Sequence, residues 1–282
     1  MGQGLAAYYQ RKYAEAIVSF TVALRLDPAD VTALSGRGAA YHQLGRWDRS
    51  LADYRALKAA AADGYSGAFG ELRALTRLGR IDEVRTLVAS RLETDPTDAT
   101  ALEFLVRLGR EDGATDAALT ALDQALDAAP EAEYLLSLRG KLRASTGDVE
   151  GARADFAAMR SVNPGDPVML NNVCWAQALE AFDLDRALVD CDAAIAAGEA
   201  AFIDSRALVL LQMGRYEEAK AEYERALAAA PDQAASSYGL GLARLALGDE
   251  AGREDLARAR TFDVDVSEDF TVFEARHPEL LR

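Results

Sequence analysis

The chain has 282 residues, of which 50% are hydrophobic, and its 46 acidic residues outnumber its 31 basic ones, giving a net charge of −15. This charge disfavours nucleic-acid binding, because contact with phosphates depends largely on Lys and Arg. No apolar run approaches the roughly 18–20 residues that span a bilayer, so we expect no membrane insertion. One compact core of this size would be large, which favours an extended array of smaller units.

Prolines mark a fixed period along the chain. Pro28, Pro96, Pro130 and Pro164 lie 68, 34 and 34 residues apart, all multiples of 34. A period of 34 is typical of solenoids built from pairs of helices. We expect a glycine turn after the first helix of each pair and a proline turn after the second. Glycine adopts the left-handed cap conformation, and proline cannot continue a helix.

The first five helix pairs differ in regularity. The first contains only part of its first helix, from Gly4 to Gln10, and its second helix ends at Asp27-Pro28. The second and fifth pairs are regular, whereas the third and fourth are weaker. Their marker residues are Gly38, Tyr41, Gly45, Trp47 and Tyr54 in the second, Gly79, Ile81, Val84, Val88 and Pro96 in the third, Gly113, Ala118, Leu122, Ala125 and Pro130 in the fourth, and Gly140, Gly147, Ala152, Phe156 and Pro164 in the fifth.

The last part of the chain departs from the pattern in two places. In the sixth pair, the residues from Ala181 to Asp185 replace the glycine turn and make it one residue longer. The eighth pair leaves the pattern near Thr261. We therefore divide the chain into a repeat region, residues 1–262, and a C-terminal cap or tail, residues 263–282.

The C-terminal segment, residues 263–282, is predicted to form a short helix. Ser267 is the expected N-cap, Phe270 and Phe273 lie on the helix, and Pro278 ends it. The last repeat of a solenoid exposes an apolar face, so we expect this helix to cap that face.

The seventh pair carries the clearest motif, Gly214-Arg215-Tyr216-Glu217-Glu218-Ala219, followed by Tyr223, Ala226 and Pro231. In this motif the chain resembles the tetratricopeptide repeat family. The resemblance implies an all-α, right-handed superhelical solenoid of about eight helix-turn-helix repeats, with a truncated first repeat and a C-terminal capping helix. It also implies a non-catalytic scaffold that binds a peptide or helix of a partner protein in its concave groove.

The resemblance also indicates which residues line the groove. In this family, positions 2, 5, 9, 12 and 13 of each first helix face it. Here these positions form a basic zone and an apolar zone with polar flanks. The basic zone contains Arg73, Arg77, Arg107, Arg110 and Lys141, with Phe69 beside it; the apolar zone contains Asn171, Trp175, Leu208, Leu211, Tyr238 and Leu242.

Two interpretations of these zones are equally favoured. In one, an extended segment with acidic and apolar side chains lies along the groove, because Arg grips carboxylates and Trp and Tyr are favoured anchors. In the other, the charges are solvated and the apolar residues only pack. The Lys and Asn pattern by which related proteins clamp chaperone tails is not matched, so such tails are not the expected ligand.

Cys174 and Cys191 fall on the first and second helix of the sixth repeat, at positions that face each other. They are either two small buried hydrophobic side chains or a disulfide, and we weigh these equally. A disulfide would imply an oxidising compartment, such as a bacterial periplasm, and an N-terminal signal that has been removed. Otherwise the chain is expected to be cytoplasmic.

The sequence contains no recognisable catalytic, cofactor or metal motif. Its two histidines, His42 and His277, lie far apart along the repeats, and the spacings typical of zinc sites, nucleophile elbows and phosphate loops are absent. We therefore expect no enzyme activity, cofactor or metal. Two alternatives are an accessory subunit of a cell-envelope or glycan-related enzyme system and, less favoured, a nucleic-acid-binding regulator. Self-association through the N-terminal helix is a further expectation.

Overall fold

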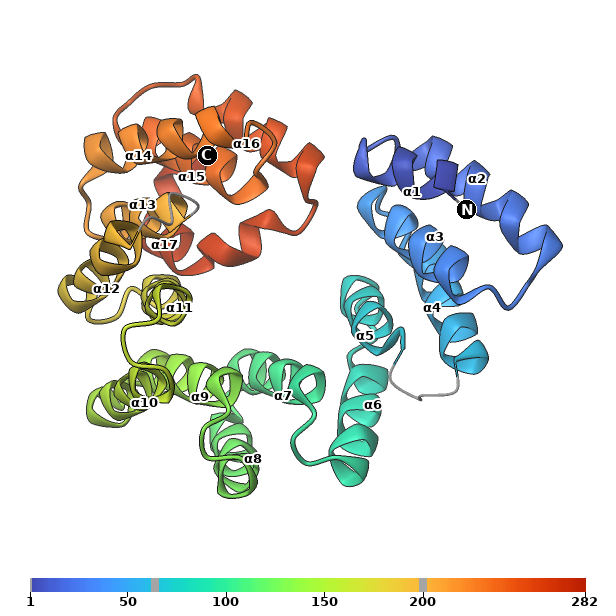
Figure 1. Ribbon diagram of the computed structural model, residues 1–282, viewed down its shortest axis with the longest axis horizontal. Coiled ribbons are helices and arrows are strands. Elements are labelled where there is room, and N and C mark those ends of the chain that lie inside the picture. Colours follow the sequence, from blue (N-terminus) through green and yellow to red (C-terminus); the bar gives the residue numbers. More distant parts are fainter. Residues whose placement is uncertain (1, 62–65, 198–201) are drawn as a thin grey trace. The chain divides into compact units, whose positions relative to one another are not determined.

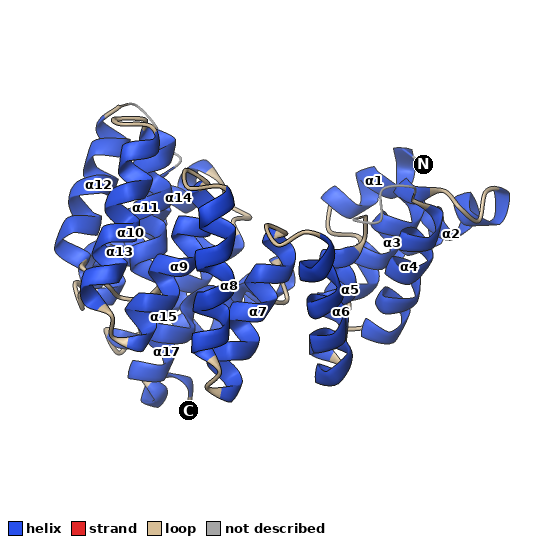
Figure 2. Ribbon diagram, turned by 90° about the horizontal axis from the view of Figure 1, so that it is seen from below, coloured by secondary structure: helices blue, strands red, loops and turns tan. Residues whose placement is uncertain are grey.

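The computed structural model describes residues 2–61, 66–197 and 202–282, and in these ranges the chain forms helices and no strand (Figure 2). It divides into two compact units, Met1–Ala118 and Leu119–Arg282, called here the N-terminal and C-terminal units. The helices follow one another in pairs within each unit (Figure 1).

The N-terminal unit contains α1 (Gly2–Tyr9), α2 (Tyr13–Leu26), α3 (Val31–Gln43), α4 (Trp47–Ala60), α5 (Ala68–Arg77), α6 (Ile81–Thr94) and α7 (Ala99–Asp112). Helix α8 (Thr115–Ala128) spans the boundary. The C-terminal unit continues with α9 (Glu133–Thr146), α10 (Val149–Val162), α11 (Pro167–Leu179), α12 (Leu184–Ala196), α13 (Ile203–Gln212), α14 (Tyr216–Ala229), α15 (Ala234–Ala246), α16 (Gly252–Phe262), η2 (Val266–Phe270), α17 (Thr271–Arg276) and η3 (Pro278–Leu281).

The proline turns stop one helix and start the next. In three of them an Asp two residues after the proline is the N-cap of the following helix. Its carboxylate accepts a hydrogen bond from the backbone N–H three residues later, at 3.0 Å for Asp30, 2.9 Å for Asp98 and 2.8 Å for Asp166. Such a cap satisfies one of the unpaired N–H groups at a helix start, which is worth about 1 kcal/mol. The period of the prolines therefore sets the helix boundaries locally.

The turns within pairs use the left-handed backbone region. Glycine occupies this position in the second and seventh pairs, with φ of 65° at Gly45 and 76° at Gly214. The sixth pair instead places two non-glycine residues there, Ala181 at 49° and Asp183 at 45°. Each such residue costs roughly 1–2 kcal/mol relative to a right-handed conformation. The lengthened turn predicted from the sequence is thus the strained turn of this repeat.

Volume complementarity sets the distance between successive pairs. Phe20, Tyr54 and Tyr223, on second helices, lie against Gly36, Gly70 and Gly239, each sixteen residues later on the next first helix. A methyl group on any of these glycines would overlap the facing ring. Where the second helix carries the smaller Val88, the residue sixteen positions later is Phe104, and both belong to one buried cluster. Large and small side chains therefore alternate across these contacts.

Buried carboxylates join the two helices of several pairs. Arg37 binds Asp53 at 2.7 Å, and Asp155 lies between Arg139 at 2.6 Å and Arg143 at 2.9 Å. Because each carboxylate is buried beside its guanidinium, loss of one partner would leave an uncompensated charge. These pairs fix the register of the helices, and they consume arginines that the sequence alone leaves unassigned.

Candidate functional site

The first helices of successive pairs pack against one another and form a layer in each unit. The layer consists of α1, α3, α5 and α7 in the N-terminal unit, and of α9, α11, α13 and α15 in the C-terminal unit. We call the surface that these layers present away from the second helices the inner face. The residues predicted to line a groove all lie on these first helices.

A row of aromatic and basic side chains crosses the inner face of the N-terminal unit. Phe69 on α5 has 45% of its surface exposed, and its ring meets the buried ring of Phe104 on α7 edge to face, with centroids 6.1 Å apart. The guanidinium of Arg73 lies 5.3 Å from the Phe69 ring, and that of Arg107 lies 5.2 Å from the Phe104 ring. These four residues, called here the Arg–Phe row, are brought together by neighbouring helices although up to 38 positions separate them.

The two other predicted arginines lie one turn further along the same helices. Arg77 is half-buried in the last turn of α5, and Arg110 is exposed near the end of α7. They belong to the same face as the Arg–Phe row and add to its positive charge. A carboxylate that reached this face would meet guanidinium groups from two helices.

A hollow of about 450 Å³ lies on the inner face nearer the N-terminus. It is formed by α1, α3, Leu57 of α4 and the two residues that precede α5, and small side chains make up much of its wall. Its lining residues are Leu5, Tyr8, Tyr9, Val31, Thr32, Ser35, Gly36, Ala39, Leu57, Ser66 and Gly67. Small residues on α3 therefore leave room for an incoming side chain.

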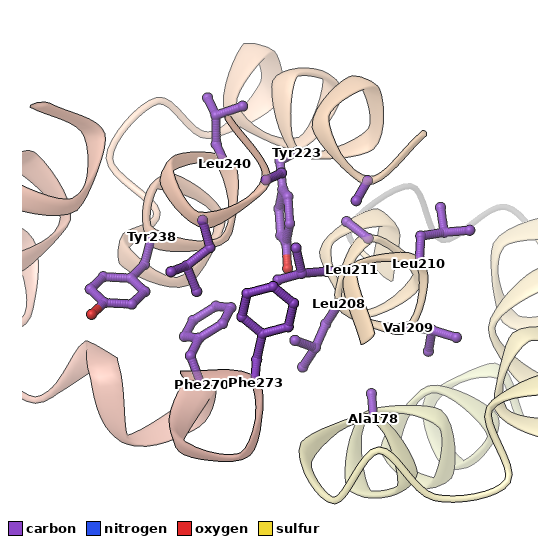
Figure 3. Close-up of a cluster of buried hydrophobic side chains, with 14 of the residues drawn as sticks. Ala178, Leu208, Val209, Leu210, Leu211, Tyr223, Tyr238, Leu240, Phe270 and Phe273 are labelled. Carbon is purple, nitrogen blue, oxygen red and sulfur yellow. The ribbon is translucent and has the colours of Figure 1, made fainter. Parts of the chain in front are cut away.

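The inner face of the C-terminal unit differs because the chain itself covers it. Leu208 and Tyr238 have no exposed surface, and Trp175 is half-buried against the same cluster. The covering residues are Phe270 and Phe273 from the C-terminal segment, whose rings point into the apolar surface of α13 and α15 (Figure 3). Leu208 and Tyr238, which were predicted to line a groove, are therefore buried in the C-terminal unit.

Several contacts hold the C-terminal segment in place. The Tyr238 and Phe270 rings lie 5.1 Å apart, and the Tyr238 hydroxyl donates a hydrogen bond to Glu274. Arg260 donates to the same hydroxyl at 2.9 Å, and Arg276 reaches Gln212 at 3.5 Å. Full burial of each Phe side chain contributes about 1.5–3 kcal/mol.

Helix formation in this segment differs from the prediction. Ser267 is not the N-cap of the helix, because it lies inside η2. The helix α17 begins at Thr271, so Phe270 ends one element and Phe273 lies in the next.

An acidic side chain of the segment lies in an unfavourable environment. Burial, together with the negative charges of Asp263 and Glu268, raises the pKa of Asp269 from 3.8 to about 6, and the positive charge of Lys141 only partly opposes this. Lys141, predicted from the sequence as part of the basic zone, thus faces a carboxylate of the chain itself. Asn171, the remaining predicted residue, has a buried carbonyl oxygen that accepts no hydrogen bond from any described residue.

The sixth repeat holds a disulfide between Cys174 on α11 and Cys191 on α12, with Cα atoms 5.6 Å apart. Both residues are fully buried. The bond links the two helices across the strained turn that contains Ala181 and Asp183.

A family model described as tetratricopeptide repeat matches residues 1–65, 105–167 and 205–262. The chain belongs to the tetratricopeptide repeat family. The stretches between the matched ranges contain the Arg–Phe row's Phe69 and Arg73 and the disulfide-bonded repeat. Tetratricopeptide repeat proteins are in general non-catalytic scaffolds, and this membership indicates a protein partner.

Individual relatives support the fold. The Protein STIP1 homolog of Dictyostelium discoideum is 31% identical over 96 residues, which is 34% of this chain and only 17% of that protein. A tetratricopeptide repeat protein from Parabacteroides merdae is 19% identical with a TM-score of 0.52, covering 86% of this chain and 98% of that one. Yeast Tom70 is 16% identical with a TM-score of 0.54, covering 94% and 62%. At these identities the two structures show the shared fold alone.

The described residues lack the features of two other kinds of site. None of their helices is long and apolar enough to cross a membrane. Within the same ranges, no three His, Cys, Asp or Glu side chains cluster so that they could hold a metal ion.

The sequence predicts that residues 263–282 cap the apolar face of the last repeat. In the structure the rings of Phe270 and Phe273 join a buried cluster with residues of α15, in the last repeat, and of α13, in the repeat before it. The contact with α13 was not predicted, because no local motif in the sequence indicates it.

Proposed function

We propose that this tetratricopeptide repeat protein is a non-catalytic scaffold that binds an acidic, partly apolar segment of a partner protein on its inner face. The Arg–Phe row supports this proposal. Phe69 exposes nearly half of its surface beside the guanidinium of Arg73, and the Phe104 ring that it meets lies beside Arg107, on a protein whose net charge is −15. An exposed ring held beside cations is suited to an apolar side chain flanked by carboxylates.

The neighbouring hollow supports the same proposal. It continues the inner face toward the N-terminus, and its walls offer Thr32 and Ser35 hydroxyls beside the rings of Tyr8 and Tyr9. An extended peptide or a helix lying along the first helices would contact both features. Aromatic and Arg residues carry much of the energy in such interfaces.

The experiment starts with peptides selected on the full chain by display of a random peptide library. The double variant Arg73→Glu/Arg107→Glu is expected to weaken the selected peptides by about 10- to 100-fold for each salt bridge lost, because charged hydrogen bonds contribute about 1.5–3 kcal/mol. Binding to wild type should weaken with salt.

The matched control is Arg25→Glu/Arg46→Glu, which changes the net charge equally at two other exposed arginines of the same unit. It is expected to leave binding unchanged. Equal weakening by both double variants would show that only the overall charge matters, and the proposal for the Arg–Phe row would then fail.

The disulfide supports a narrower proposal about location. Disulfides persist in oxidising compartments and are rare in the cytosol. We therefore propose that the chain works in an oxidising compartment. A thiol count on protein denatured without reductant tests this: no reactive thiol is expected, and two would contradict it.

A further inference from the structure

The inner face of the C-terminal unit is a groove already filled by a peptide-like segment. The segment follows α16 after only three residues, returns across α15 as η2 and α17, and places Phe270 and Phe273 against α13 and α15 (Figure 3). Both rings are 1% exposed. The segment therefore shows which side chains this surface accepts: two aromatic rings three residues apart.

The polar part of the groove also selects a feature of the segment. The hydroxyl of Tyr238 receives a hydrogen bond from Arg260 and donates one to the carboxylate of Glu274. Glu274 directly follows Phe273 in the chain. A carboxylate one residue after the second ring is thus held by the Tyr238 hydroxyl of α15, which itself accepts a hydrogen bond from Arg260 of α16.

Other polar groups in and beside the groove are poorly satisfied by the segment. The Nε2 atom of Gln212, the Oδ1 atom of Asn171 and the hydroxyl of Tyr223 are buried, and none has a hydrogen-bond partner among the described residues. Asp269 of the segment is half-buried, and burial together with the negative charges of Asp263 and Glu268 raises its pKa. Unpaired buried polar groups are costly. The segment therefore fills the apolar part of the groove well but leaves part of the hydrogen bonding of the groove unmet.

We propose that residues 263–282 are a displaceable occupant of this groove. Their place is taken by an acidic segment of a partner protein that presents two aromatic side chains three residues apart and a carboxylate directly after the second. This deepens the proposed function, since it assumes that the inner face binds peptides. A partner that also pairs Gln212 and Asn171 binds more favourably than the chain's own segment.

Covalent linkage decides how tightly a partner must bind. A segment joined through a short linker is present at an effective concentration of roughly millimolar, so a free peptide of equal intrinsic affinity competes poorly. Weakening the internal segment removes this competition. Loss of one buried Phe ring typically weakens an apolar contact by about 100-fold or more.

The test uses the full chain and a fluorescent peptide with the sequence of residues 263–282. The variant Phe273→Ala is expected to bind this peptide saturably. Wild type and the matched control Val272→Ala, on the same helix, are expected to bind it about 100-fold more weakly or not measurably. A peptide with Ala at both Phe positions should not bind to any of the three proteins.

Hydrogen exchange on the same proteins separates displacement from unfolding. In Phe273→Ala the amides of α17 are expected to exchange faster while those of α13 and α15 stay protected, and added peptide should not alter α5 or α7. Simultaneous loss of protection in α13, α15 and α17 would overturn the proposal, because the segment would then be an integral part of the repeat fold. So would a Phe273→Ala protein with wild-type protection in α13 and α15 that fails to bind the peptide.

These outcomes are distinguishable from failure of the proposed function. The Arg73→Glu/Arg107→Glu variant changes only the N-terminal unit. If it leaves binding of the selected peptides unchanged while Phe273→Ala still binds the peptide of residues 263–282, only the proposal for the Arg–Phe row fails. If it weakens the selected peptides while Phe273→Ala does not bind that peptide, only the inference about residues 263–282 fails.

Discussion

Asp269 provides a quantitative test of how the C-terminal segment is held. Its carboxylate is half-buried, and the charged groups that act on it are Asp263 and Glu268, which raise its pKa, and Lys141, which lowers it. The uncharged hydroxyl of Tyr223 also lies within its electrostatic reach. We expect Asp269→Asn to stabilise the protein at neutral pH, because the amide removes a buried charge without changing the size of the side chain.

The magnitude follows from the pKa difference. A rise from 3.8 to about 6 is roughly two pH units, and each unit corresponds to 1.36 kcal/mol. Contact with solvent reduces this, so the variant is expected to gain about 1–3 kcal/mol in free energy of unfolding above pH 6. Well below pH 3.8 the aspartate is protonated in both the folded and the unfolded state, so the gain should be small at pH 4 and vanish at lower pH. Wild-type stability relative to the variant is therefore lost as the pH rises from about 4 through 6.

Urea unfolding of wild type and variant at pH 4, 5, 6 and 7.5, followed by circular dichroism, measures this difference. Glu254→Gln, which removes an exposed charge on α16, is the control and should change stability by less than about 0.5 kcal/mol at every pH. A variant less stable than wild type at pH 7.5 would refute the reasoning, because it would mean that Lys141 stabilises ionised Asp269 more than burial disfavours it. A gain that does not depend on pH would refute it as well.

Three further predictions concern the repeats. Cys174→Ser is expected to lower the free energy of unfolding by about 3 kcal/mol, which is the loss of chain entropy expected for the loop that the Cys174–Cys191 disulfide closes. Reductant should lower the free energy of unfolding of wild type by the same amount and leave that of the variant unchanged. Gly239→Ala should lower the free energy of unfolding by about 1–3 kcal/mol, because the added methyl group overlaps the buried Tyr223 ring. Gly2→Ala is the control, since open space surrounds Gly2, and it should be neutral or stabilising. Thermal unfolding of both variants measures the difference. Asp155→Ala should lower the free energy of unfolding by about 3–5 kcal/mol, because it leaves Arg139 and Arg143 without their buried carboxylate. A loss below about 1 kcal/mol in urea unfolding would show that these ion pairs are solvated.

Much of the helical pattern could be predicted from short-range features. Asp30, Asp98 and Asp166 cap helices within three residues of themselves, and Gly45 and Gly214 adopt left-handed turns at their own positions. These preferences act over a few bonds, so they can be read along the chain. The failure at Ser267 has the opposite cause, because packing of Phe270 against Tyr238 sets the local backbone there.

The candidate site was less accessible to prediction. The periodicity put Phe69, Arg73 and Arg107 on first helices, but only the packing of α5 on α7 brings the Phe69 and Phe104 rings together. Arginines also look alike in a sequence: Arg139 is consumed by buried carboxylates, whereas Arg73 lies over an aromatic ring. Their partners depend on which helices become neighbours.

The sequence by itself determined the repeat length, the turns that begin and end many of the repeat helices, the family and the helices that carry the predicted groove residues, because each of these depends on residues a few positions apart or on a regular period. Only the tertiary structure decided that Phe69 is exposed on the inner face of the N-terminal unit, whereas Tyr238 is covered on that of the C-terminal unit. The covering contacts join residues as far apart as Gln212 and Arg276, and no local preference or period encodes them. They depend instead on the shape of an apolar groove and on the two phenylalanine rings that fill it.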